Sequence, residues 1–188
     1  MAKGFTIQNQ QGLYFLTFTI VGWIDVFTRD EYRKIIIDSF NYCKKEKGLL
    51  LFSYVIMSNH IHIIARTDNE KGLSAIVRDF KKFTSVKIIS AIENNRMESR
   101  REWMLKLFKY YAKFNSNNPN YQFWKQDNHP IELISDKWVK QKLDYIHLNP
   151  VRAGWVTEER DFKYSSARNY QGEEGVLDVV LLDVNYFQ

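Results

Sequence analysis

The sequence is poor in cysteine, proline and glycine, and each shortage excludes a class of protein. One cysteine among 188 residues, Cys43, cannot build a disulfide framework or a thiolate metal cluster, which agrees with a reducing compartment. Three prolines and eight glycines are too few for a Pro/Gly linker, and no internal repeat or low-complexity run is present. We therefore expect one folded domain rather than a fibrous, disordered or disulfide-stapled chain.

Long apolar runs are also missing. The longest run near the N-terminus, residues 13–27, is interrupted by polar residues and a glycine, and no small-residue cleavage site follows it. The sequence therefore favours neither a signal peptide nor a membrane span. A cytoplasmic protein without a membrane partner is expected.

Positive charge is unevenly distributed along the chain. The net charge is +5, but residues 171–188 contain four acidic residues and no basic one, so residues 1–170 carry 27 basic against 18 acidic groups. This excess fits a phosphate-rich partner, and it also fits a surface whose charge only maintains solubility. We interpret residues 1–188 as a single domain in which residues 171–188 form an acidic and apolar C-terminal extension.

Hydrophobic periodicity predicts the order strand, helix, strand, strand, helix, with further helices after it. The predicted strands cover residues 13–23, 49–57 and 60–66, and the predicted helices cover residues 30–45, 73–92, 97–115 and 137–147. Gly48 is expected to cap the first helix, and Asn149-Pro150 to end the last one. This order predicts an α+β fold, a ferredoxin-like antiparallel sheet with helices packed on one face. The other face is then available for a substrate.

Three shorter segments have weaker signals. Residues 115–120 are interpreted as a polar break, residues 121–125 as a short strand or platform, and residues 176–184 as an edge strand.

Two of the four histidines, His60 and His62, stand one residue apart in a β-branched, apolar segment. In a strand, residues i and i+2 project from the same face, so the two imidazoles are expected to lie side by side. Such a pair can hold a metal ion, although imidazole alone does not select which one. Two half-buried strand histidines with hydrogen-bond partners are the alternative interpretation.

A tyrosine on the last predicted helix supplies a candidate nucleophile. Tyr145 and Asn149 are four residues apart and share a helix face, whereas His147 lies about 200° around the helix and points away from them. A phenol ordinarily has a pKa of about 10, so near neutral pH it attacks only where a cation or a base stabilises the phenolate. Attack on a phosphodiester would give a covalent phosphotyrosine that a free hydroxyl can reverse. His129 and His147 are interpreted as structural.

Three segments together resemble the HUH one-tyrosine transposases, in particular the REP-associated tyrosine transposase branch of the IS200-like transposases. They are Asn59-His60-Ile61-His62, the string from Tyr145 through Asn149-Pro150-Val151 to Val156, and Tyr164-Ser165-Ser166. The resemblance extends from the first strand to about Tyr170. It implies the HUH nuclease fold, Mg²⁺ or Mn²⁺ as cofactor, and DNA, single-stranded or in hairpins, as partner. It also implies an enzyme that cleaves and rejoins DNA through a 5′-phosphotyrosine, leaving a free 3′-hydroxyl.

Carried over by position, the resemblance makes His60 and His62 metal ligands and Tyr145 the nucleophile. Asn149 corresponds to a third ligand, a position where relatives also use other groups. In some relatives the tyrosine helix serves the histidines of a partner subunit, so a homodimer is possible. The residues expected to bind nucleic acid are basic or aromatic: Arg78, Lys81, Lys82, Arg100, Arg101, Lys106, Trp124 and Arg152. Alternatively, the basic ones form a solvated face and Trp124 belongs to the core.

Two other functions remain open from the sequence. The first is a domesticated module that binds structured single-stranded nucleic acid without cutting it, and whose binding is sensitive to salt. The second is a metal-dependent nuclease in which water attacks and Tyr145 only positions the strand.

Overall fold

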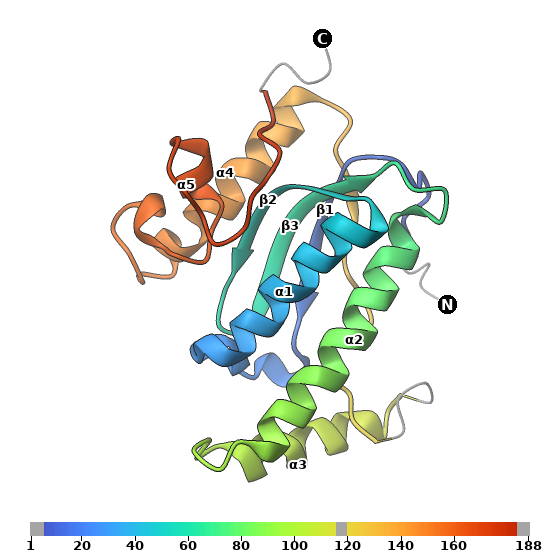
Figure 1. Ribbon diagram of the computed structural model, residues 1–188, viewed down its shortest axis with the longest axis vertical. Coiled ribbons are helices and arrows are strands. Elements are labelled where there is room, and N and C mark those ends of the chain that lie inside the picture. The colour runs from blue at the N-terminus through green and yellow to red at the C-terminus, as the bar shows by residue number, and fades with distance from the viewer. Residues whose placement is uncertain (1–5, 116–119, 184–188) are drawn as a thin grey trace.

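The fold is organised around an antiparallel sheet with the strand order β2-β3-β1-β4 (Figure 1). The computed structural model describes residues 6–115 and 120–183. The strands are β1 (Tyr14–Thr19), β2 (Leu49–Ile56), β3 (His60–Thr67) and β4 (Ile131–Glu132). The three long strands confirm the predicted ones, because their β-branched and aromatic residues suit a buried, pleated surface.

The register of the sheet places the two histidines beside β1. Thr17 pairs with His62 and Thr19 pairs with His60 in the β1–β3 ladder. A short turn joins β2 to β3, closed by a 2.9 Å hydrogen bond from the Met57 amide to the His60 carbonyl. Both histidine side chains therefore project from one face of the central strand, while Ile61 projects from the other.

Helices α1 (Asp30–Lys47) and α2 (Gly72–Asn94) cover the face of the sheet opposite the histidines (Figure 1). Phe80 of α2 stacks on Phe40 of α1 with ring centroids 4.4 Å apart, and it also lies 5.5 Å from Phe18 of β1. Gly48 ends α1 in a left-handed conformation with φ of 69°, as predicted for a glycine cap. The α+β, ferredoxin-like architecture predicted from the sequence is thus observed.

Helix α4 (Asp136–Arg152) packs on the histidine face, so helices lie on both faces of the sheet and not on the one face predicted. This helix is also longer than predicted. The proline preference placed its end near residue 147, but Pro150 lies inside the last turn and is buried. Proline disfavours helix at the preceding residue without forbidding it, and burial of Pro150 offsets the lost hydrogen bond. The helix ends where Gly154, with φ of 73°, donates to the Val151 carbonyl.

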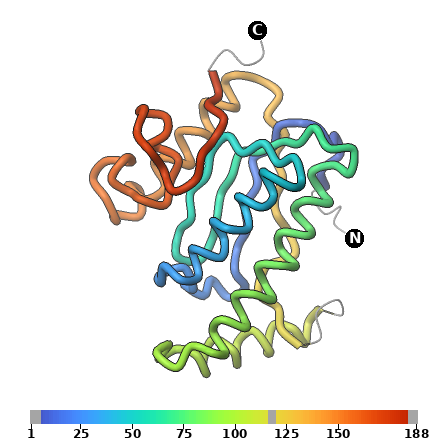
Figure 2. Tube along the Cα trace, viewed as in Figure 1, coloured from blue at the N-terminus to red at the C-terminus, as the bar shows by residue number. Residues whose placement is uncertain are grey.

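The C-terminal segment lies along the outer edge of β2 (Figure 2). It contains the short helices η3 (Glu159–Asp161) and α5 (Ala167–Tyr170). Backbone hydrogen bonds join Tyr164 and Ser166 to β2, and the Val180 amide donates to Leu51. Residues 176–183 form no strand, which corrects the prediction for residues 176–184, of which residue 184 lies outside the described part. A single ladder bond is too few for a strand.

Other local predictions also need correction. Residues 121–125 form only an isolated bridge, between Trp124 and Ile20, and β4 was not predicted because it is two residues long. The strand was expected to continue to residue 23, but the short 3₁₀ helix η1 (Val21–Trp23) takes its place, and a second one, η2 (Val26–Thr28), follows. Of the expected polar break at residues 115–120, residues 116–119 lie outside the described residues.

Among the helices that the structure describes, none has the length and apolar content needed to cross a membrane.

Helix α3 (Arg101–Ala112) begins four residues later than predicted because Glu98 forms a buried ion cluster before it. The Glu98 carboxylate lies 2.7 Å from Arg29 Nε and 3.1 Å from Arg100 Nε. It also accepts from the Arg100 amide at 3.1 Å. Burial alone would raise the pKa of Glu98, but hydrogen bonds and charge from Arg100, with the charge of Arg29, lower the pKa below its ordinary value.

Replacing Glu98 with glutamine should therefore destabilise the fold. Glu98→Gln leaves two arginines facing a neutral amide, and we expect a loss of about 2 to 3 kcal/mol in the free energy of unfolding. Urea denaturation followed by circular dichroism measures this loss. Glu102→Gln, on the exposed side of α3, is the matched control and should change stability by less than about 0.5 kcal/mol. Equal effects of the two substitutions would contradict a structural role for the cluster.

Candidate active site

His60 and His62 are neighbours on β3, with ring centroids 4.8 Å apart. Their shared face follows from the strand alternation that the sequence predicted. His62 is 5% exposed, and its ring stacks against Phe15 with centroids 5.2 Å apart. His60 is half-buried at the end of the strand, closer to solvent.

A hydrogen bond holds each imidazole by its Nδ1 atom. His60 Nδ1 lies 2.7 Å from the amide oxygen of Asn59, and His62 Nδ1 lies 2.9 Å from the hydroxyl of Thr17. An amide oxygen only accepts, so His60 Nδ1 carries the proton and its Nε2 presents a lone pair. The Thr17 hydroxyl can accept from His62 in the same way. This arrangement, in which a second residue orients an imidazole by its other nitrogen, is typical of metal-binding histidines.

Burial keeps both imidazoles uncharged near neutral pH. It lowers the pKa of His60, and it lowers the pKa of His62 to about 3, with the charges of His60 and Lys142 adding to the effect. A neutral imidazole is the form that binds a metal ion. The pair therefore has the protonation state that a metal site requires.

Tyr145 of α4 lies against His62 within the same chain. The two ring centroids are 5.1 Å apart, and the Tyr145 ring also contacts Phe15 of β1 edge-on at 5.8 Å. Two cationic side chains of α4 flank the phenol: Lys142 Nζ lies 5.6 Å and the Arg152 guanidinium 5.7 Å from the ring centroid. The fold thus brings together a histidine pair and a phenol separated by more than 80 residues in the sequence.

Asn149 is half-buried on α4, one turn after Tyr145. Its position on the Tyr145 side of the helix agrees with the predicted spacing. Within the described residues, no group of three or more histidine, cysteine or carboxylate side chains gathers anywhere. A metal ion held by His60 and His62 would therefore complete its coordination with an amide oxygen, water or substrate oxygens.

His147 has a structural position, as predicted. Its Nε2 lies 2.9 Å from the hydroxyl of Ser166 and 3.3 Å from that of Ser53, and the two hydroxyls are 2.9 Å apart. Burial lowers the pKa of His147 to about 4. This cluster connects α4 to β2 and to the Tyr164-Ser165-Ser166 segment, so it fixes the helix that carries Tyr145.

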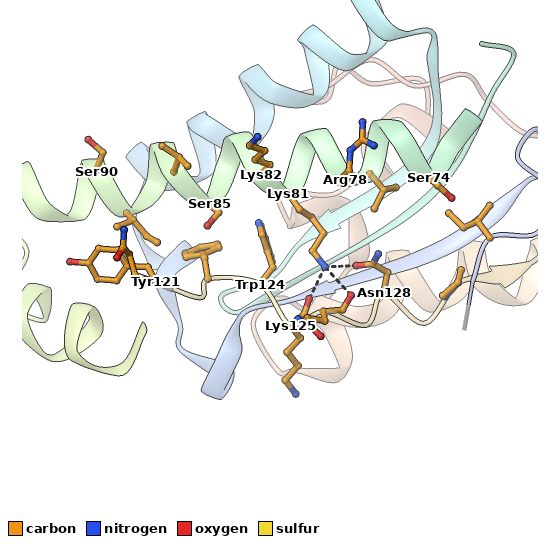
Figure 3. A pocket seen from close by; sticks show the side chains of 18 of the residues that line it. Ser74, Arg78, Lys81, Lys82, Ser85, Ser90, Tyr121, Trp124, Lys125 and Asn128 are labelled. Atoms are coloured by element: carbon orange, nitrogen blue, oxygen red, sulfur yellow. Dashed lines mark hydrogen bonds between the residues drawn. The ribbon is translucent and has the colours of Figure 1, made fainter. Parts of the chain in front are cut away.

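A groove of about 990 Å³ lies between α2 and residues 120–130, on the other side of the sheet from the histidines (Figure 3). Arg78 and Lys82 are exposed along it. Lys81 reaches from α2 to that segment, where its ammonium donates to the Lys125 carbonyl and to Asn128 Oδ1, both at 2.6 Å. Burial lowers the pKa of Lys81 to about 8. These bonds favour a structural role for Lys81.

The other residues predicted to bind nucleic acid are dispersed. Trp124 is 5% exposed and donates its indole N–H to Thr84 at 3.0 Å, which supports the alternative that it is a core residue. Arg100 is engaged with Glu98 and Asp25. Arg101 and Lys106 lie on α3. Arg152, beside Tyr145, is the member of this set that adjoins the candidate active site.

Sequence reasoning missed three residues of the site. Asn59 stands next to His60, and an adjacent amide is a local signal that could have been used. Lys142 precedes Tyr145 by three residues, a spacing that places both on one helix face. Thr17 could not be found without the β1–β3 register.

Comparison with known proteins places the chain among transposases. The family model described as "Transposase IS200 like" matches residues 16–126, more than half of the chain. The chain therefore belongs to the IS200-like transposase family. His60 and His62 lie inside the matched range, and Tyr145 and Asn149 lie beyond it. No curated protein matches.

A solved structure of a transposase shows the same fold. The REP-associated tyrosine transposase bound to a REP hairpin has a TM-score of 0.64 and 17% sequence identity, over 100% of this chain and 95% of that one. A putative transposase from Deinococcus radiodurans has a TM-score of 0.43 and 12% identity, over 76% of this chain and 92% of that one. The first of these similarities extends the shared fold through the α4 and C-terminal regions.

The buried histidines predict that acid destabilises the protein. Burial lowers the folded-state pKa of His62 to about 3 and that of His147 to about 4, from the ordinary value of 6.5. At a pH between these lowered values and 6.5, the unfolded chain therefore binds more protons than the folded one. Stability is therefore lost as pH falls below about 6.5, by at most about 1.4 kcal/mol per pH unit for each histidine. Urea denaturation at pH 7 and pH 5, with metal chelated, measures this slope.

His147→Gln tests how much of that slope is local. Glutamine can replace the hydrogen bonds to the serine hydroxyls but does not titrate, so we expect a shallower pH dependence. A His147→Gln slope equal to that of the unmodified chain would contradict a neutral His147.

Proposed function

We propose that this protein is a metal-dependent transposase that cleaves and rejoins single-stranded or hairpin DNA through a 5′-phosphotyrosine intermediate. The observation that carries the proposal is the contact between Tyr145 and His62, 5.1 Å between ring centroids, in a chain of the IS200-like transposase family. Because both residues belong to the same chain, we propose that Tyr145 acts in cis.

The histidine pair fits a divalent ion. Two neutral imidazoles, each oriented through Nδ1, leave two Nε2 lone pairs, and Asn149 is one turn from Tyr145 on the facing helix. We propose His60 and His62 as ligands of Mg²⁺ or Mn²⁺, with Asn149 as the candidate third. When bound, such an ion withdraws charge from a phosphate oxygen and orients the diester.

Tyr145 is the proposed nucleophile. Its hydroxyl oxygen attacks the phosphorus in line with the leaving 3′-oxygen, so a phosphorus–oxygen bond to tyrosine forms while the bond to the 3′-oxygen breaks. The phenol loses its proton and the departing 3′-oxygen gains one, leaving a free 3′-hydroxyl. Attack by a 3′-hydroxyl on the phosphotyrosine reverses the exchange and joins strands, since both steps exchange one phosphodiester for another.

Lys142 and Arg152 support this step electrostatically. Both place positive charge within 6 Å of the Tyr145 ring, where a phenolate and a phosphate would meet. The edge-on contact of Tyr145 with Phe15 helps to hold the phenol ring in place.

DNA is the proposed partner. The similar transposase of known structure is bound to a REP hairpin, and residues 1–170 of this chain have an excess of basic groups. Arg78 and Lys82, exposed along the α2 groove, are proposed phosphate contacts away from the reacting atoms.

Removing the Tyr145 hydroxyl should abolish covalent attachment to DNA. Tyr145→Phe keeps the ring contacts with His62 and Phe15, so binding of a hairpin oligonucleotide should change less than about twofold while the adduct disappears. Denaturing gel electrophoresis of a labelled oligonucleotide incubated with Mn²⁺ detects the adduct. Tyr42→Phe, on exposed α1 surface, is the matched control and should form adduct as the unmodified protein does.

Each contrary outcome selects a different function. An adduct that persists in Tyr145→Phe means another nucleophile. Binding without any adduct in the unmodified protein indicates a non-cleaving binding module. Cleavage without an adduct indicates a nuclease in which water attacks.

Asn59 should control metal affinity without touching the ion. Asn59→Ala removes the oxygen that orients His60, and such partners typically contribute 10- to 100-fold in metal affinity. Isothermal titration of the protein with Mn²⁺ should show a loss in this range. Asn94→Ala, at the exposed end of α2, is the control. An unchanged Mn²⁺ affinity in Asn59→Ala would contradict the assigned role of the pair.

A further inference from the structure

Trp23 has an unusual position beside the candidate active site. It follows β1 in η1, its φ is 57°, and its side chain is 58% exposed. A left-handed backbone is costly for a bulky residue, and exposure of an indole leaves apolar surface in water. The Trp23 ring lies edge-on to His60 with centroids 6.2 Å apart. Neither folding nor core packing accounts for an indole held there.

The side chain of Asn59 connects Trp23 to His60. Its amide oxygen accepts from His60 Nδ1 at 2.7 Å, and its amide nitrogen donates to the Trp23 carbonyl at 3.3 Å. One amide therefore fixes both the imidazole and the backbone that presents the indole. The position of Trp23 is coupled to the candidate metal ligand.

Lys125 places positive charge against the indole. Its Nζ lies 4.4 Å from the Trp23 ring centroid. The backbone of Lys125 is held at the end of β1, where its amide donates to the Thr19 carbonyl at 2.8 Å. In Figure 3 the side chain of Lys125 points away from α2, which agrees with the position of its ammonium against Trp23.

A cavity of about 320 Å³ is lined by Lys125 and by Gly22, the residue before Trp23. The cavity is lined by aromatic rings, side-chain amides, a lysine and a glycine: Tyr111, Phe114, Gln122, Gln126, Lys125 and Gly22. A Cβ on Gly22 would lie 2.8 Å from a ring carbon of Tyr111, so glycine is needed for this close approach. The volume of the cavity is at the small end of the range for ligand pockets.

We propose that Trp23, Lys125 and this cavity bind one unpaired nucleotide of the DNA strand, next to the phosphate that reaches His60 and Tyr145. The base stacks on the part of the indole that Lys125 leaves open, and the ammonium contacts a phosphate. Gln122 and Gln126 offer donors and acceptors to a base edge. The inference rests on the proposed function for the identity of the strand.

The chemistry of the site selects an unpaired nucleotide. Exposed aromatic rings beside basic side chains are the usual means of holding single strands, because every base has a face that stacks. A base within a duplex already has neighbours on both faces, so it is not available to an indole. A role in core packing would instead require burial, and Trp23 is 58% exposed.

The test measures binding in the Tyr145→Phe background, so that covalent attachment does not contribute. The probes are DNA hairpins with a single-stranded extension in which each unpaired position in turn is made abasic. Trp23→Ala should weaken binding to the intact probe about 5- to 150-fold, the range measured for base–aromatic stacking. With one abasic position, Trp23→Ala should cause no further loss, since the stacked base is already missing.

Two more substitutions at this position separate stacking from folding. Trp23→Gly suits the φ of 57° and should preserve or raise the melting temperature while weakening binding as Trp23→Ala does. Trp23→Tyr keeps a ring and should retain most of the affinity. Lys125→Gln should lower the slope of log affinity against log salt by about 0.7, the value for one single-strand phosphate contact.

Trp155→Ala is the matched control, because Trp155 is 44% exposed but lies beyond α4, against Phe162. It should bind as the Tyr145→Phe background does. The inference is overturned if folded Trp23→Ala and Trp23→Gly both bind every probe within twofold of that background. It is also overturned if their loss is the same on all abasic probes.

The two proposals fail in different ways. If the unmodified protein forms no adduct but Trp23→Ala loses base-dependent binding, the nucleotide site stands and the transposase chemistry does not. If the adduct forms and the Trp23 variants bind normally, the chemistry stands and the nucleotide site does not.

Discussion

The burial of His62 between the sheet and α4 is the constraint on which the candidate active site depends. Removed from water, this imidazole stays neutral, and its Nδ1 bond to Thr17 fixes the ring in the β1–β3 ladder. The same burial requires a helix over that face of the sheet, and the helix that covers it carries Tyr145. A neutral ligand and a nearby nucleophile thus arise from one packing arrangement.

The position of α4 is itself over-determined. Tyr145, on one face of α4, packs against Phe15 and His62. His147, on another face, lies within hydrogen-bond distance of the hydroxyls of Ser53 in β2 and Ser166 in the C-terminal segment. The Tyr164-Ser165-Ser166 segment therefore matters for the site although it contacts neither histidine of the pair. The Ser166 hydroxyl of this segment holds α4 through His147, in the position where Tyr145 contacts His62.

Much of this arrangement could be predicted from local sequence. The alternation around His60 and His62 required a shared strand face, and the apolar spacing with Gly48 predicted α1 almost to the residue. Long-range features were not accessible in that way. Thr17 and Lys125 lie at the site because of tertiary pairing: Thr17 through the register of β1 with β3, and Lys125 through its backbone bond to Thr19. Trp23 was included in an expected strand, because β-propensity does not reveal a left-handed backbone. The end of α4 was misplaced because a proline preference is weaker than burial.

The C-terminal segment also has a consequence for the sheet as a whole. An outermost strand with free amides and carbonyls is a template on which another molecule can polymerise. Tyr164, Ser166 and Val180 occupy hydrogen-bonding positions along β2, so those positions are not available to a second copy. A segment outside the candidate active site thereby covers the β2 edge of the sheet, where another molecule could otherwise add a strand.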